Sequence, residues 1–195
     1  MSRHILQIIP AILLLTAVAE ARVMSLSPGH TLRIAGTSNI HDWSADVTEI
    51  DVDFTLETTT LTKIQDLRAE MFRSLVIRIP VEGISSKTSG LTGKIHKHLN
   101  KKQHTLIVFE LTRVTEIDTE LDTARITATG SLTAAGETHE VSLLVAATMS
   151  ADDALSISGV APLLMTSFGI KPPTEMFGAI KAADEISVSF NLSFE

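Results

Sequence analysis

The sequence has no cysteine among its 195 residues. A chain without cysteine forms no disulfide, and we expect no lipid anchor on an N-terminal cysteine. The stability of the fold must therefore come from its hydrophobic core, for which this length is sufficient. The same length is too short for two sizeable cores, and we find neither an internal repeat nor an interdomain linker. The sequence therefore predicts one domain.

An excess of positive charge is also missing, because the formal net charge is −7 at pH 7. A nucleic-acid partner needs a basic face that neutralises phosphates, so this acidity argues against one. One segment is basic although the chain as a whole is acidic. It has four lysines and three histidines within eleven residues: Lys94, Lys97, Lys101, Lys102, His96, His98 and His104. A solvated helix face is the favoured interpretation, and a site for an anion or a lipid head group is the alternative.

The first apolar run, residues 5–19, is shorter than the ~20 predominantly apolar residues that a membrane-spanning helix needs. It follows Arg3 and leads into Ala19-Glu20-Ala21, which offers small residues at both positions that a signal peptidase reads. The pattern predicts a cleaved signal peptide over residues 1–21. We expect a soluble, periplasmic mature domain over residues 22–195.

Alternation of apolar and polar residues dominates the rest of the chain, which is the period of a half-buried β-strand. It is found at Leu32 and Ile34; at Val52, Phe54 and Leu56; at Leu75, Ile77, Ile79 and Val81; at Ile126, Ala128, Gly130 and Leu132; at Val141, Leu143, Val145 and Ala147; and at Ile186, Val188, Phe190, Leu192 and Phe194. Residues 106–111 are apolar on both faces except at Glu110, and they predict a further strand. Many strands of similar spacing favour an all-β sandwich or barrel.

Turns and helices are few. Residues 134–138 predict a hairpin connection in which Gly136 can take a positive φ. Leu91, Ile95 and Leu99 recur every four residues and predict a short helix with one narrow apolar stripe. A second short helix is expected over residues 174–180, because a Pro-Pro pair precedes it.

Four pieces of sequence, taken in order, resemble the YceI-like family. They are SLVIRIPVEGI at residues 74–84, GKIHKHLNKKQH at 93–104 with TLIVFEL directly after it, GSLTAAGETHEV at 130–141, and SFGI at 167–170 before an apolar final strand. The HDW triplet at residues 41–43 adds to the resemblance, which extends from about Leu32 to the C-terminus. Members of the family resemble lipocalins. The resemblance therefore implies a closed antiparallel barrel of about eight strands, with one or two short helices, around a tunnel for an isoprenoid or another amphiphile.

The opening strand departs from the better-studied members of the family. Residues 29–43 read GHTLRIAGTSNIHDW, a variant of the type GTS-x-(L/I)-HDW, where those members have D-x-x-H-S-x-(V/I)-x-F-x-(V/I)-x-H. This difference bears on the identity of the ligand more than on the fold.

A hydrolytic site is the first alternative, since Ser38, His41 and Asp42 supply the side-chain types of a catalytic triad. On a continuous strand, however, Ser38 and Asp42 would face one side and His41 the other. No G-x-S-x-G motif is present either. We interpret the three residues as strand-end groups that bond to the backbone, and we expect no catalytic residue and no enzymatic activity.

A metal site is the second alternative, because the chain carries several histidines. His96 and His98 stand two residues apart, which places them about 200° apart around a helix. The sequence after His139 lacks the second histidine of an H-E-x-x-H motif. We expect no metal site, although the fold could still bring distant histidines together, with His98 and His104 as plausible partners and His41, His96 and His139 as further candidates.

An apolar cavity is the third alternative. Residues 165–178 place large apolar side chains on and beside a Gly/Pro-rich connection, which predicts a lid folded over one barrel end. The single tryptophan, Trp43, is interpreted as a plug of the barrel rather than as a ligand contact. The expected ligand-binding residues are Phe54, Phe109, Met165, Phe168, Met176, Phe177 and Phe190.

The sequence and the resemblance together predict an exported protein that sequesters or carries a long apolar molecule. The expected ligand is a polyisoprenoid or a prenylated quinone, and no other cofactor is expected. The alternative is a filled barrel that serves as a stress or interaction module and contacts a membrane or protein partner. A homodimer and a transient contact with a membrane surface are both compatible with the sequence.

Overall fold

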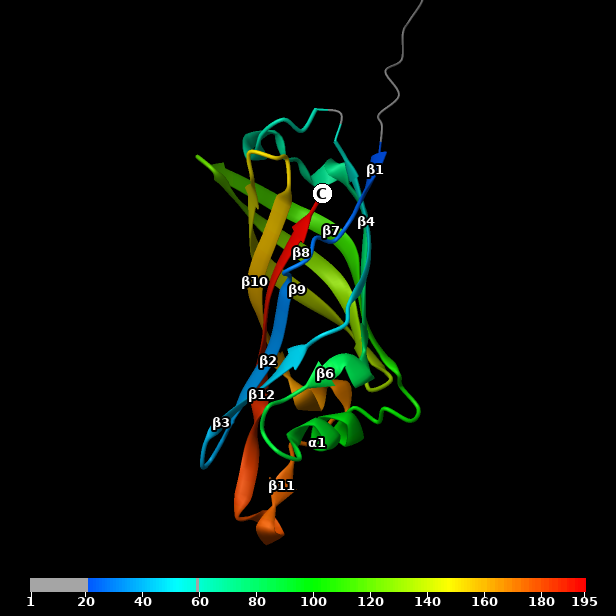
Figure 1. Cartoon of the computed structure of the whole chain (residues 1–195), viewed down its shortest axis with the longest axis vertical. Coiled ribbons are helices and arrows are strands. Elements are labelled where there is room, and N and C mark those ends of the chain that lie inside the picture. Colours follow the sequence, from blue (N-terminus) through cyan, green and yellow to red (C-terminus); the bar gives the residue numbers. More distant parts are fainter. Residues whose placement is uncertain (1–20, 59) are drawn as a thin grey trace, which may run out of the picture.

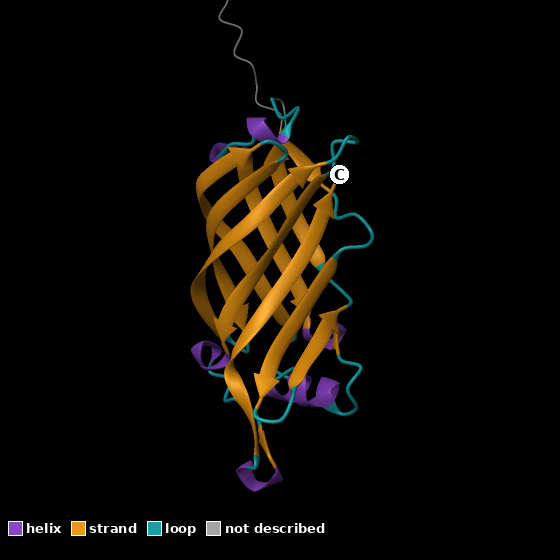
Figure 2. Cartoon of the chain, turned by 90° about the vertical axis from the view of Figure 1, so that its left-hand side faces the viewer, coloured by secondary structure: helices purple, strands orange, loops and turns teal. Residues whose placement is uncertain are grey.

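A strongly curled antiparallel sheet forms the body of the protein in the computed structural model, which describes residues 21–58 and 60–195 (Figures 1 and 2). Its strands are β1 (Ala21–Met24), β2 (Thr31–Ser38), β3 (Asp42–Val47), β4 (Asp51–Glu57), β5 (Phe72–Pro80), β6 (Ile84–Ser85), β7 (Leu106–Glu120), β8 (Thr123–Ala134), β9 (Glu137–Met149), β10 (Leu155–Leu164), β11 (Thr174–Glu175) and β12 (Ile180–Phe194). The helices are α1 (Leu91–His98) and 3-10 turns at Ile64–Asp66, Ala69–Met71, Val81–Gly83, Met165–Phe168 and Met176–Gly178. All but one residue of the expected signal peptide lie outside the described residues.

The order of the strands is β1-β4-β5-β7-β8-β9-β10-β12-β2-β3-β6, and β11 pairs with β12. The expected lipocalin-like barrel is confirmed, with more strands than the eight predicted. Three of the strands, β1, β6 and β11, are only four, two and two residues long, which is too short for alternation to reveal them. In addition, only residues 48–50 separate β3 from β4, so the sequence does not clearly divide these two strands. The alternating segments of the sequence form strands, as predicted, except that Val81 belongs to the 3-10 turn after β5.

The segment directly after β1 is joined to the end of β12. The backbone N–H of Ser25 donates to the carbonyl of Glu195 at 2.8 Å, and that of Ser27 donates to the carbonyl of Ser193 at 2.7 Å. Since β1 also pairs with β4, these bonds connect β4 to β12 through the N-terminal segment. The barrel is thereby closed at this end, and these backbone groups have partners.

The same end of the barrel is packed solid. Phe54 is fully buried, with its ring centroid 4.9 Å from that of Phe194 in an edge-to-face arrangement and 6.0 Å from that of Phe72. Ile64 and Leu67, from the segment that crosses this end, are buried against them. The top of the barrel in Figure 1 therefore holds a conventional hydrophobic core.

Helix α1 lies across the opposite end, as its apolar stripe predicts (Figure 1). Leu99, directly after the helix, is 9% exposed, and Leu91 and Ile95 are half-buried on the same side. The ring nitrogen Nε2 of His96 lies 2.9 Å from the carbonyl of Ile84, to which it can donate, and this contact fixes the helix to β6. A helix of eight residues is too short to be stable alone, so this packing holds it in place.

The predicted second helix is wrong. Thr174 and Glu175 instead pair with Lys181 and Ile180, so the segment forms a β-hairpin with the start of β12. Met176, Phe177 and Gly178 at its tip all have positive φ, which an α-helix does not allow. The predicted turn at residues 134–138 is confirmed, with Gly136 at φ 92°. Among the described residues, no helix is long and apolar enough to cross a membrane.

Candidate functional site

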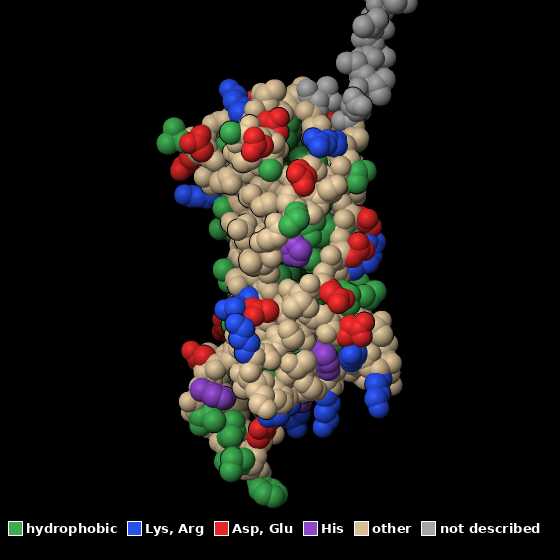
Figure 3. Space-filling view, viewed as in Figure 1, with side chains coloured by type: hydrophobic (Ala, Val, Ile, Leu, Met, Phe, Trp, Pro, Cys, Tyr) green, Lys and Arg blue, Asp and Glu red, His purple; other side chains and the backbone are tan. Residues whose placement is uncertain are grey.

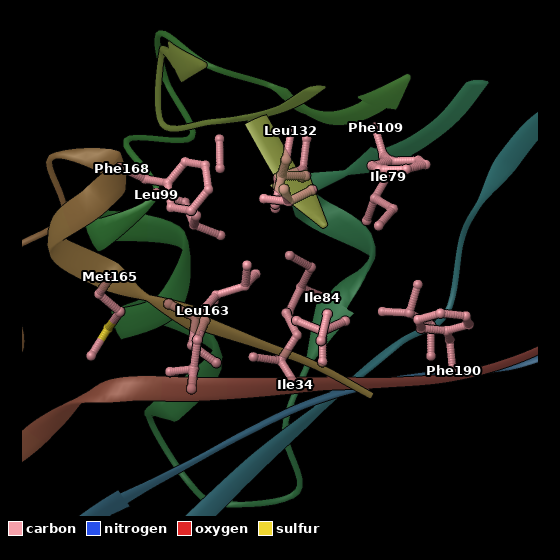
Figure 4. A pocket seen from close by; sticks show the side chains of 18 of the residues that line it. Ile34, Ile79, Ile84, Leu99, Phe109, Leu132, Leu163, Met165, Phe168 and Phe190 are labelled. Carbon is pink, nitrogen blue, oxygen red and sulfur yellow. The ribbon is translucent and has the colours of Figure 1, made fainter. Parts of the chain in front are cut away.

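A cavity of about 520 Å³ runs inside the barrel. Because successive side chains of a strand point to opposite faces, every second residue of seven strands reaches it. Its walls are apolar and include Leu32 and Ile34 of β2, Leu75, Ile77 and Ile79 of β5, Ile107, Phe109 and Leu111 of β7, Ile126, Ala128 and Leu132 of β8, Val141, Leu143 and Val145 of β9, Ile157, Ala161 and Leu163 of β10, and Ile186, Val188, Phe190 and Leu192 of β12. Figure 4 shows side chains of lining residues around the central space, ten of them labelled.

Two phenylalanines of the wall lie against glycines of the neighbouring strand. A Cβ atom on Gly130 would stand 2.5 Å from the ring of Phe109, and one on Gly159 would stand 3.0 Å from the ring of Phe190. Each ring therefore occupies the place of the missing side chain along the wall, an arrangement known as aromatic rescue of glycine. The rings cover the strands without filling the centre, which helps to leave the lumen hollow.

Polar side chains reach the cavity only at the end that carries α1, which we call the mouth. The polar and charged lining residues are Ser38, His41, Thr88, Ser89, Lys94, His98 and Glu175, and they come from the β2–β3 turn, the α1 region and β11. The remaining lining residues are apolar, apart from the indole N–H of Trp43. The site is thus a long apolar tunnel with a polar entrance, a shape that suits an amphiphile.

The β2–β3 turn forms one side of the mouth. Ser38 Oγ accepts from the backbone N–H of His41 at 3.1 Å and donates to the carbonyl of the same residue at 2.7 Å. The chain turns here, so Ser38 and His41 come together, which the expectation of a continuous strand did not allow. Ser38 Oγ and His41 Nδ1 are 3.1 Å apart, but this hydroxyl is engaged with the backbone of the turn, as the sequence predicts.

Trp43 lies at the mouth and lines the cavity, so its expected role as a plug of the barrel base is not what the structure shows. It pairs with Gly36 of β2, and a Cβ atom on Gly36 would stand 2.5 Å from the indole. Only glycine at this position lets the indole lie flat on the neighbouring strand. The same glycine–aromatic arrangement thus recurs at the rim.

Helix α1 and the β11–β12 hairpin form the other side of the mouth. Lys94 of α1 forms an ion pair with Glu175 of β11. Both side chains are more than one third exposed, so the pair contributes little stability, but it connects the two elements across the entrance. Burial lowers the pKa of His98, and the positive charge of Lys97 lowers it further. His98 is therefore neutral near pH 7.

Four of the seven predicted ligand-binding residues line the cavity: Phe109, Met165, Phe168 and Phe190. Met165 and Phe168 belong to the 3-10 turn after β10 and are 7% and 5% exposed. The ring of Phe168 also packs edge-to-face on that of His139, with centroids 5.4 Å apart.

The other three predicted residues are elsewhere, and the structure corrects their placement. Phe54 belongs to the packed end and does not line the cavity, because the rings of Phe72 and Phe194 surround it. Met176 and Phe177 are 71% and 113% exposed at the hairpin tip. They form no lid, because the pairing of β11 with β12 carries them away from the barrel end.

Sequence reasoning did not bring the mouth residues together, although it considered Ser38 and His41 as hydrolytic candidates and placed Lys94 and His98 in the basic segment. Leu91, Ile95 and Leu99 were predicted to dock the helix, and they also line the cavity. No sequence signal places Trp43 at the mouth, because its pairing with Gly36 depends on the register between β2 and β3. Within the described residues, no group of three or more His, Cys, Asp or Glu side chains could hold a metal ion.

Comparisons with known proteins agree with this architecture. A BcnA protein of Burkholderia cenocepacia is 15% identical and has a TM-score of 0.61, and the match covers 83% of this chain and 95% of that one. A polyisoprenoid binding domain from Saccharophagus degradans, implicated in plant cell wall breakdown, is 8% identical with a TM-score of 0.62, over 89% and 97%. A YCEI protein of Campylobacter jejuni is 13% identical with a TM-score of 0.57, over 76% and 82%. No relative among curated proteins matches the sequence.

These likenesses and the hollow barrel define a lipocalin-type fold with an internal apolar cavity. The sequence model of the YceI-like domain matches residues 29–194, which is most of the chain. The chain therefore belongs to the YceI-like family, as the sequence motifs indicate.

Proposed function

We propose that the protein binds one long apolar or amphiphilic molecule inside the barrel, with the chain in the tunnel and a polar head at the mouth. The observation that carries this proposal is the distribution of side chains: the polar and charged lining residues gather at one end of an otherwise apolar cavity. An isoprenoid chain or a prenylated quinone has the matching distribution of polarity. The similarity to a polyisoprenoid binding domain supports this class of ligand.

The size of the cavity is adequate for such a ligand. Its volume of about 520 Å³ is within the range of roughly 300–1,000 Å³ that is typical of small-molecule sites. Burial is worth about 0.8 kcal/mol per CH₂, so a five-carbon isoprenoid unit contributes roughly 4 kcal/mol. Association costs about 4–15 kcal/mol, and a micromolar complex needs a net gain of about 8 kcal/mol. Around four buried units are then enough if the cost is about 8 kcal/mol.

The proposed role is sequestration or transport of this ligand outside the cytoplasm, which rests on the predicted signal peptide. Binding needs no chemical step, and the residues at the mouth have the character of head-group contacts rather than of a nucleophile with its base. We therefore propose a binding protein without catalytic activity.

Filling the lumen tests the proposal. Ala128 of β8 lines the cavity and is 7% exposed, whereas its neighbour Thr127 is on the outer face of the same strand. Ala128→Phe should lower the affinity for a fluorescent polyprenyl probe by at least about tenfold, and Thr127→Phe should leave it unchanged. Ala161→Phe, on β10, repeats the test if the first variant is unstable, because Ala161 also lines the cavity.

Equal probe affinity for the folded wild type, Ala128→Phe and Thr127→Phe would contradict binding in the tunnel. Absence of any probe binding by the wild type would favour a barrel that works through its surface.

A further inference from the structure

The tip of the β11–β12 hairpin exposes two large apolar side chains. Phe177 is 113% exposed and Met176 is 71% exposed, and the hairpin projects beyond the barrel at the bottom of Figure 1. Both residues also have positive φ, at 56° and 48°, which costs conformational energy for side chains of this size. Packing within the protein offsets neither the exposure of these apolar side chains nor the conformational cost of their positive φ. The tip therefore has the properties of a contact site for another molecule.

Most lysines of the chain belong to the segments that form this tip and the mouth. Seven of the eight lysines belong to two segments, residues 87–104 and 171–182, which contain no arginine and a single acidic residue, Glu175. These segments have a formal net charge of +6, although the whole chain has −7. Lys87, Lys94, Lys97, Lys102, Lys171 and Lys181 are all exposed. Figure 3 shows basic side chains (blue) on this end of the molecule, above the apolar tip.

Hydrogen bonds fix the tip relative to the mouth. The side-chain amide of Asn39 donates to the carbonyl of Ala179 at 2.8 Å, and its oxygen accepts from the backbone N–H of Lys181 at 2.9 Å. These bonds fasten the hairpin to the β2–β3 turn, where Ile40 is 59% exposed and also reaches the cavity. The exposed apolar residues, the basic segments and the entrance are thus parts of one end.

We propose that this end docks on an anionic lipid bilayer, with Met176 and Phe177 inserted among the head groups and the lysines above them. Basic segments bind anionic lipid surfaces, and apolar side chains beside them enter the interface. In this orientation the mouth faces the membrane, from which an amphiphile could enter the tunnel. Docking is a property of the surface, so it does not require the proposed cavity ligand.

The composition favours a bilayer over an acidic protein partner. Protein–protein interfaces are enriched in arginine and depleted in lysine, whereas this end has seven lysines and no arginine in the two basic segments. A specific protein interface also buries about 800 Å² on each partner around a packed centre. Two side chains on a narrow hairpin offer no such centre, but they are sufficient for shallow insertion.

Vesicle sedimentation tests the proposal with the purified chain. The wild type should bind vesicles of phosphatidylcholine and phosphatidylglycerol, bind vesicles of phosphatidylcholine alone much more weakly, and dissociate at high salt. Met176→Ser/Phe177→Ser should reduce binding by at least about tenfold. Leu121→Ser is the matched control, because Leu121 is 86% exposed and has positive φ at the far end of the barrel.

A second pair of variants tests the charge. Lys97→Gln/Lys102→Gln should lower the affinity for anionic vesicles by about 25-fold, since each lysine near such a surface is worth about fivefold. Lys63→Gln/Arg125→Gln removes the same charge at the other end and should have little effect. Probe affinity in the tunnel, measured in parallel without vesicles, should be unchanged in all four variants.

Failure of the wild type to bind anionic vesicles would overturn the proposal and point to a protein partner for this end. Equal losses in the mouth variants and in their far-end controls would overturn it as well. Either result would leave the tunnel assay of the proposed function intact, so the two proposals can fail separately.

Discussion

If the lumen is hollow, truncation of Phe54 and truncation of Phe190 should lower the free energy of unfolding by different amounts. Phe54 is fully buried at the packed end, between the rings of Phe72 and Phe194. Phe54→Ala loses both the transfer free energy of the ring and the contacts around the new void. We therefore expect its unfolding free energy to fall by about 3–5 kcal/mol.

Phe190 packs on the wall at Gly159, but its ring already borders the cavity. Removing it enlarges an existing space rather than opening a new one in close-packed surroundings. The transfer free energy is then the main loss, and we expect Phe190→Ala to cost about 1.5–3 kcal/mol. Affinity for the polyprenyl probe should fall in Phe190→Ala and stay unchanged in folded Phe54→Ala.

Equilibrium urea unfolding of the ligand-free protein, with equal slopes for wild type and variants, measures both costs. If Phe54→Ala does not fold, Phe54→Leu replaces it in the comparison. Its unfolding free energy should fall for the same reason but by less. A cost for Phe190→Ala as large as that for Phe54→Ala, without an effect on probe affinity, would refute the hollow lumen. It would show that the walls collapse around Phe190 in solution.

Four further measurements test other parts of the molecule. Leu99→Asp should lower the unfolding free energy by at least ~2 kcal/mol, because an unpaired charge would replace a buried side chain, and an unchanged melting temperature would disprove the docking of α1. Phe177→Ala should change stability by no more than about 0.5 kcal/mol, since the ring has no packing to lose. Because burial lowers the pKa of His98, the unfolded chain takes up its proton at higher pH, so stability should decrease as pH falls below about 6.5. His98→Gln should weaken that decrease in stability. A pH profile identical to that of the wild type would refute the contribution of His98. N-terminal sequencing of the exported protein should find a start at or near Arg22, and retention of Met1 would contradict the predicted signal peptide.

Periodicity was sufficient to predict most of the barrel. The alternation in residues 126–132 identified both a strand and its inner face, because Ile126, Ala128 and Leu132 all line the cavity. The spacing of Leu91, Ile95 and Leu99 likewise predicted a helix and its docking side. In both cases one face is apolar over several residues, so the local pattern and the tertiary packing agree.

The hairpin tip could not be predicted in this way. A Pro-Pro pair followed by Thr174 and Glu175 favours a helix start, and nothing local predicts positive φ at Met176 and Phe177. Pairing with β12, a tertiary interaction, overrides the local preference. The lid expected from these residues failed for the same reason.

Local sequence patterns could not predict the hollow lumen either. An apolar inner face is common to a filled barrel and to an empty one, so alternation does not distinguish them. The distinction depends on the register, which sets Phe190 opposite Gly159 and the ring of Phe109 against Gly130. Register between strands is a property of the assembled sheet, and one sequence alone does not reveal it.

The central claim is that the tunnel holds an apolar chain with its head at the mouth. Mass spectrometry of lipids extracted from the protein, purified without detergent from the cells that naturally make it, tests this claim most directly. We expect one class of long-chain amphiphile at close to one molecule per protein, and loss of it in Ala128→Phe but not in Thr127→Phe. Protein that is free of lipid, or that carries the same lipid in both variants, would contradict the claim.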